Sequence, residues 1–168
     1  MSGIVTLIGN PRAGSRTHRA ALEATEAVAR RLGLRNPGET VDLAVLAGEI
    51  HAADPSSDLD AALKIVASAD VLVVASPTYK GTYTGLLKAF LDLLPSGALR
   101  SATALPLLLM GDPRHALAVE VHLRPLLVEL GARVPTPGLA LLESDLPRLN
   151  DVLDRWADRT APQVEVAA

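Results

Sequence analysis

Short apolar runs alternate with longer amphipathic stretches along this chain, and that alternation limits the folds open to it. The apolar runs, interpreted as strands, cover residues 4–8, 41–46, 71–75, 103–110 and 134–142. Ala, Leu and Val recur at helical spacing between and after these runs, at residues 17–34, 54–69, 84–94, 114–130 and 146–159. Strands that alternate with helices predict βα units and a parallel sheet.

The predicted architecture is an α/β fold in which helices cover both faces of a five-stranded parallel sheet. The flavodoxin-like strand order 2-1-3-4-5 suits the chain length better than a six-stranded dinucleotide fold, which needs one more βα unit. Pro135 and Pro137 place the last strand at an edge, because proline has no backbone N–H to donate to a neighbouring strand. We expect a single flavodoxin-like domain over residues 1–168.

Composition excludes several classes of function. The 16 basic and 19 acidic residues are interspersed and the formal net charge is -3, so the basic stripe that nucleic-acid binding needs is missing. The absence of cysteine excludes disulfides, thiolate metal sites and thiol nucleophiles. The chain begins directly with a strand pattern and not a signal peptide, and its apolar runs are too short to span a bilayer. We expect a soluble cytoplasmic protein with no nucleic-acid or membrane partner.

The loop after the first strand has the composition of a phosphate-binding loop. Its sequence, GNPRAGSRT at residues 9–17, leads from a strand into a helix N-terminus, where backbone N–H groups lack helical partners. Arg12 and Arg16 add positive charge, and the hydroxyl groups add donors. The alternative is an ordinary Ser/Thr helix cap with surface arginines beside it.

Comparison with known phosphate loops narrows the ligand. Gly9 and Gly14 match the glycines of the P-loop pattern, but Ser15 and Arg16 stand where Lys and Ser/Thr belong. The dinucleotide pattern GxGxxG is absent. The loop therefore favours a terminal monophosphate over a nucleoside triphosphate.

Three of the chain's four aromatic residues, Tyr79, Tyr83 and Phe90, follow the third apolar run within one short stretch. The carboxyl edge of an open parallel sheet is where ligands bind, so the tyrosines either contact a ligand or pin the next helix to the sheet. Gly111 and Asp112 follow the fourth strand at the same edge. They either face this site or form a simple turn that caps a helix.

The histidines give no metal or catalytic pattern. His18 and His51 are interpreted as surface residues whose spacing in the sequence indicates no partner, and His115 and His122 share one face of a predicted helix without a carboxylate ligand set. The HExxH and GxSxG motifs are both absent, so we expect neither a metal site nor a Ser-His-Asp triad.

Two motifs resemble those of the NAD(P)H-dependent FMN reductase family. GNPRAGSRT at residues 9–17 is similar to that family's GSPRxxSRT loop, and SPTYKGTYTGLLKAFLDLLP at residues 76–95 is similar to its flavin loop and the following helix. Residues 115–125 resemble its fourth helix. The resemblance covers roughly residues 3–135 and is nearest to the flavin reductases of sulfonate utilisation.

The resemblance implies which residues hold the cofactor. Those that hold the FMN phosphate would be Asn10, Arg12, Ser15, Arg16 and Thr17. Those that flank the isoalloxazine ring would be Pro77, Thr78, Tyr79 and Lys80, with the loop at Gly111 and Asp112 completing the site. The chain departs from the family at Asp112, which puts a carboxylate where Gly-Gly is common. It also departs at Val121, beside His122, where the subgroup commonly carries an aromatic residue or histidine at a tetramer interface.

The implied function is hydride transfer from NADPH or NADH to FMN, without a catalytic side chain, to supply reduced flavin to a monooxygenase. The chain would act as a homodimer or homotetramer. Two alternatives remain open at this stage. One is a reductase of quinones, azo dyes or metal oxyanions with tightly bound FMN, and the other is a non-catalytic flavin-binding electron carrier.

Overall fold

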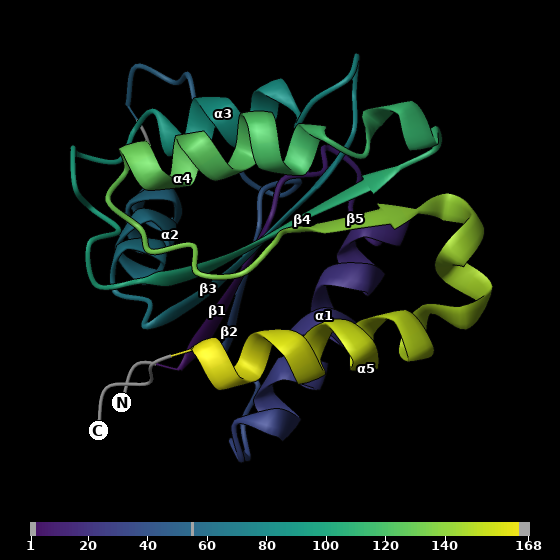
Figure 1. Ribbon diagram of the computed structural model, residues 1–168. Coiled ribbons are helices and arrows are strands. Elements are labelled where there is room, and N and C mark those ends of the chain that lie inside the picture. Colours follow the sequence, from purple (N-terminus) through teal and green to yellow (C-terminus); the bar gives the residue numbers. More distant parts are fainter. Residues whose placement is uncertain (1–2, 55, 165–168) are drawn as a thin grey trace.

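The computed structural model describes residues 3–54 and 56–164, so residues 1–2, Pro55 and residues 165–168 lie outside the described residues. In this part of the chain, five parallel strands form one sheet in the order β2-β1-β3-β4-β5, which confirms the predicted flavodoxin-like architecture (Figure 1). The strands are β1 (Ile4–Ile8), β2 (Glu39–Asp42), β3 (Val71–Pro77), β4 (Thr103–Met110) and β5 (Leu139–Leu142).

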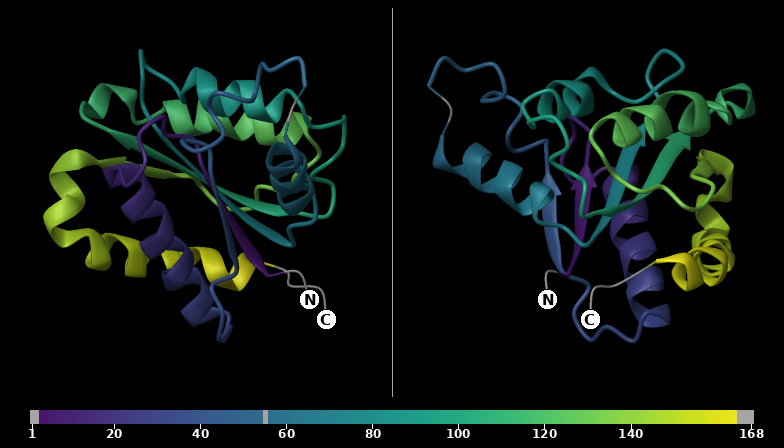
Figure 2. Two further views of the ribbon diagram at one scale, coloured as in Figure 1. Left: turned by 180° about the vertical axis from the view of Figure 1, so that it is seen from behind. Right: turned by 60° about the vertical axis from the view of Figure 1, so that its left-hand side comes forward.

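Helices cover both faces of the sheet, as Figures 1 and 2 show. One face carries α1 (Arg16–Arg31) and α5 (Leu149–Thr160), and the other carries α2 (Ser57–Ala67), α3 (Gly85–Leu91) and α4 (Arg124–Glu129). The sheet separates two buried apolar clusters, one containing Trp156 and the other containing Phe90. Every residue of β1, β3 and β4 is buried, which explains why these strands are apolar apart from Thr6, Ser76 and Thr103.

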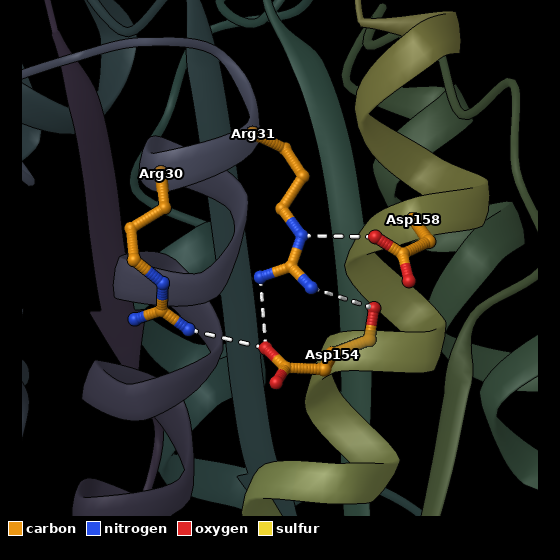
Figure 3. A network of polar contacts seen from close by, with 4 residues as sticks. All are labelled: Arg30, Arg31, Asp154 and Asp158. Atoms are coloured by element: carbon orange, nitrogen blue, oxygen red, sulfur yellow. Dashed lines mark hydrogen bonds and ion pairs between the residues drawn. The ribbon is translucent and has the colours of Figure 1, made fainter.

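Polar side chains join the end of α1 to α5 (Figure 3). Arg31 donates to Asp158 at 3.0 Å and to Asp154 at 2.8 Å, while Arg30 donates to Asp154 at 3.1 Å. Hydrogen bonding from Arg31 holds the pKa of Asp154 below its ordinary value. Arg31 is partly buried, but Arg30, Asp154 and Asp158 are each about half exposed or more, so water screens these pairs and their contribution to stability is small.

The second strand is shorter and earlier than predicted. β2 ends at Asp42 because it pairs with β1 only up to Ile8. Beyond that point the Leu43 N–H donates to the Ile8 carbonyl, and the Asp42 carboxylate accepts from the Ala44 N–H at 3.0 Å. This local bond starts a turn where the apolar pattern had predicted continued strand.

The fifth strand lies at the sheet edge as predicted, but it begins at Leu139 and not at residue 134. Arg124 reaches across and donates to the carbonyls of Val134 and Thr136, each at 2.5 Å. Glu120 accepts from the Gly138 N–H at 2.5 Å, which ties down the same segment. These side chains satisfy the backbone in place of a neighbouring strand, so the segment remains irregular.

The fourth predicted helix is divided into three pieces. A 3-10 turn covers Pro113–His115, a π-helix covers Val119–Leu123, and α4 follows. Pro125 cannot donate to the carbonyl of Val121 one turn earlier, and the adjacent Arg124 N–H bonds instead to Val119, five residues back. The single helix on which His115 and His122 were predicted to share a face is therefore interrupted: His115 ends the 3-10 turn and His122 lies in the π-helix. Among the described residues, no helix is long and apolar enough to cross a membrane.

Candidate functional site

A cleft of about 530 Å³ opens at the carboxyl edge of the sheet, where the loops after β1, β3 and β5 meet. The residues that line it are Asn10, Arg12, Ala13, Gly14, Ser15, Arg16, Thr17, Pro77, Tyr79, Leu109 and Glu143. All five residues predicted for the phosphate loop thus lie together, beside two of the four predicted for the ring. A second cavity of about 380 Å³ lies at the opposite, amino edge, remote from these residues.

Side chains within the first loop determine its shape. Asn10 accepts from the Arg12 N–H at 2.9 Å and donates to Thr17 Oγ1 at 3.1 Å, so both ends of its amide are used inside the loop. Ser15 caps α1, because its Oγ accepts from the His18 N–H at 3.1 Å. Asn10 therefore shapes the loop, while the Ser15 and Thr17 hydroxyl groups each retain a proton to donate.

Backbone donors of this loop remain available. Among the hydrogen bonds of the described residues, none is donated by the backbone N–H groups of Gly14, Ser15, Arg16 or Thr17. Gly14 has a φ of +62°, a left-handed conformation that glycine adopts without strain. Unpaired N–H groups at a helix N-terminus, next to Arg12, form a concave donor surface. Such N–H groups can donate hydrogen bonds to the oxygens of a phosphate group.

A buried polar link holds the loop after β3 against the end of β1. Thr84 Oγ1 donates to the Gly9 carbonyl at 2.6 Å and accepts from the Leu87 N–H at 3.1 Å, which caps α3. The Thr84 N–H donates to Ser76 Oγ at 3.0 Å. An added Cβ at Gly9 would lie 2.7 Å from Leu87 Cβ, so glycine is required where α3 approaches β1.

The segment that follows β3 makes a tight turn beside the cleft. Tyr79 and Thr82 exchange backbone hydrogen bonds at 2.8 and 3.3 Å around Lys80 and Gly81, whose φ values are +53° and +87°. Left-handed conformation is unfavourable for lysine, so this turn stores backbone strain next to the site. Tyr79 is 43% exposed and lines the cleft, whereas Lys80 and Thr78 do not line it. The Thr78 N–H is bonded to the Leu109 carbonyl at 2.8 Å.

Gly111 and Asp112 lie just beyond the cleft lining. Asp112 accepts from the Arg114 side chain at 2.6 Å and from its backbone N–H at 2.9 Å. These bonds lower the pKa of Asp112 to about 2. The carboxylate is therefore paired with a guanidinium of its own turn, which is the helix-capping alternative noted for this motif.

Two acidic contacts were missed by sequence reasoning. Glu143 follows β5 directly and forms a two-pronged ion pair with Arg16, at 2.8 and 2.9 Å. The rule that ligand-site residues follow parallel strands would have found it, had the fifth strand been searched. His18 Nδ1 lies 3.0 Å from Asp42 Oδ2, so His18 has a partner that its spacing in the sequence did not indicate. Its partner ends β2 and is distant in sequence.

The sheet order and the cleft at its carboxyl edge together define a flavodoxin-like α/β protein. Residues 3–146 match the model of the NADPH-dependent FMN reductase family, and the chain belongs to that family.

Relatives and solved structures agree with this assignment. The chain is 33% identical to NADH-dependent FMN reductase SfnF of Pseudomonas putida, over 81% of this chain and 75% of that protein. It is 37% identical to an FMN reductase (NADPH) of Escherichia coli, over 77% and 68% of the two chains. The apo structure of the NADH:FMN oxidoreductase EmoB has a TM-score of 0.76 at 30% identity, covering 98% and 94%. An oxidoreductase from Corynebacterium diphtheriae has a TM-score of 0.80 at 26% identity, covering 96% of each chain.

The chain is accordingly an oxidoreductase that uses FMN and a nicotinamide nucleotide, NADH or NADPH. Both predicted motifs fall within the matched residues.

Proposed function

We propose that the cleft binds FMN, and that the enzyme passes reduced FMN to a flavin-dependent monooxygenase. The phosphate would bind to the free N–H groups of the first loop with Arg12 and Arg16, and the isoalloxazine ring would lie beside Pro77 and Tyr79. The observation that carries this proposal is the juxtaposition of four unpaired backbone donors with an exposed aromatic ring in one cleft.

FMN, when bound, would supply the redox chemistry by accepting a hydride from the nicotinamide. The protein's part is to bind and orient the two cofactors. Alignment of two reactants can contribute roughly 7–11 kcal/mol in favourable cases, so no acid or base is required of a side chain. Tyr79 offers a ring surface, while Phe90 and Trp156 are buried in the two cores. The described part of the cleft thus holds one aromatic side chain, which favours a second ring supplied by the nicotinamide.

Binding of FMN and of riboflavin, which lacks the phosphate, tests the assignment. We expect the Arg12→Gln variant to weaken FMN binding by about tenfold or more, because hydrogen bonds to charged groups contribute about 1.5–3 kcal/mol, and to leave riboflavin binding unchanged. Arg19→Gln is the matched control, since Arg19 lies on α1 outside the cleft lining and pairs with Glu23. Equal affinity of the wild-type protein for FMN and riboflavin would contradict the proposed phosphate site.

Release of flavin tests the monooxygenase proposal. We expect FMN to separate from the protein on gel filtration, and NADPH or NADH to be consumed in air when FMN is added. In a mixture with a flavin-dependent monooxygenase, this consumption should support substrate oxygenation. FMN that stays bound through gel filtration, together with direct reduction of quinones or azo dyes, would favour the alternative reductase.

A further inference from the structure

Glu143 is the one carboxylate among the described residues that line the cleft. It forms an ion pair with Arg16, one of the two arginines expected to bind the phosphate. Both terminal nitrogens of Arg16 are bound to Glu143, Nη2 to Oε1 at 2.8 Å and Nη1 to Oε2 at 2.9 Å. An added Cβ at Gly111 would lie 4.0 Å from the Glu143 carboxyl carbon, so the carboxylate also lies against the loop after β4. It therefore spans the cleft between two loops of the predicted site.

We infer that Glu143 competes with the phosphate of FMN for Arg16, and that this competition weakens FMN binding. The inference rests on the proposed function, because it assumes that the phosphate binds in the first loop. It concerns how tightly that site holds its ligand.

The charges in the cleft explain the competition. Arg12 and Arg16 supply two positive charges and Glu143 supplies one negative charge. A phosphate monoester carries about -1.5 to -2 at neutral pH. When it enters the loop, either the carboxylate remains beside a second anion or Arg16 must leave Glu143. Each outcome offsets part of the binding free energy.

The exposure of the pair limits the effect to a modest one. The Arg16 and Glu143 side chains are 64% and 39% exposed, so water screens their attraction and their exchange with a phosphate is reversible. A buried pair of this geometry would instead lock the cleft. We expect the competition to weaken FMN binding roughly three- to tenfold.

The test is the Glu143→Gln variant, which keeps the side-chain shape and removes the charge. Dissociation constants for FMN and riboflavin are measured by flavin fluorescence without nicotinamide, at low and high salt. We expect FMN to bind about three- to tenfold more tightly and riboflavin to bind as before, with the gain shrinking at high salt. Asp154→Asn makes the same charge change on α5, outside the cleft lining, and should alter neither constant.

A double variant separates competition from simple repulsion. If Glu143 acts through Arg16, the gain from Glu143→Gln should fall to less than about half in an Arg16→Gln background. Weaker FMN binding in Glu143→Gln would overturn the inference, because it would mean that Glu143 orients Arg16 for the phosphate. An equal gain for riboflavin, a gain in Asp154→Asn, or a full gain without Arg16 would overturn it as well. Failure of the wild-type protein to prefer FMN over riboflavin would instead defeat the proposed phosphate site.

Discussion

Replacing Thr84 by valine should loosen the connection between the two loops that form the cleft. The substitution keeps the shape of the side chain and removes only its hydroxyl group. That hydroxyl donates to the Gly9 carbonyl at 2.6 Å and accepts from the Leu87 N–H at 3.1 Å, and Thr84 is 2% exposed. Water cannot easily replace either bond at so buried a position.

The magnitude follows from these two bonds. A buried carbonyl left without its donor costs about 1–3 kcal/mol, and a lost helix cap costs about 0.5–2 kcal/mol. Because the two losses share one atom, we expect the free energy of unfolding to fall by about 2–4 kcal/mol. Thr84→Ser keeps the hydroxyl and loses a methyl group, so it should cost only about 1 kcal/mol.

Urea denaturation of the wild-type protein and both variants measures the free energy of unfolding, and flavin fluorescence measures FMN binding. We expect Thr84→Val to weaken FMN binding as well, since the end of β1 is released from the loop that carries Tyr79. The reasoning would be refuted if Thr84→Val were as stable as Thr84→Ser within about 0.5 kcal/mol, the usual scatter for unimportant sites.

Three further substitutions test particular contacts. Gly9→Ala should lower the free energy of unfolding by about 1–3 kcal/mol in urea denaturation, because its Cβ would lie 2.7 Å from Leu87 Cβ, whereas Gly48→Ala meets no atom within 4 Å and should have little effect. Lys80→Gly should raise it by about 0.5–1 kcal/mol in the same assay, since relief of the +53° φ outweighs the added chain entropy; a loss of stability would show that the turn is not strained. Hydrogen bonding from Arg124 keeps the pKa of Glu120 below its ordinary value of 4.5. The Glu120 carboxylate therefore stabilises the fold above pH 4.5, and this contribution is lost as the pH falls through the lowered pKa. The stability difference between wild type and Glu120→Gln should therefore shrink between pH 6 and pH 3, and a difference that grew towards acid would contradict the assignment.

Local sequence patterns were sufficient for the sheet and for most of the cleft. Alternating apolar and amphipathic stretches predicted the strands and helices, because each kind of element buries a face with its own period. The strand order followed from the number of βα units that the chain length allows. The loop at residues 9–17 and the residues Pro77 and Tyr79 were placed together correctly, since parallel strands bring successive carboxyl ends to one edge. The same patterns failed at element ends, where β2 and β5 proved shorter than their apolar runs.

The sequence by itself therefore determined the flavodoxin-like sheet, the family and the edge at which the cleft lies. Only the tertiary structure decided which charged groups meet there. Arg16 and Glu143 are 127 positions apart, and no periodicity relates them. Arg124 likewise binds carbonyls of the segment before β5, a contact that no periodicity indicates. Backbone periodicity is a local property that a sequence displays directly, whereas pairing between distant side chains depends on where folding brings their ends.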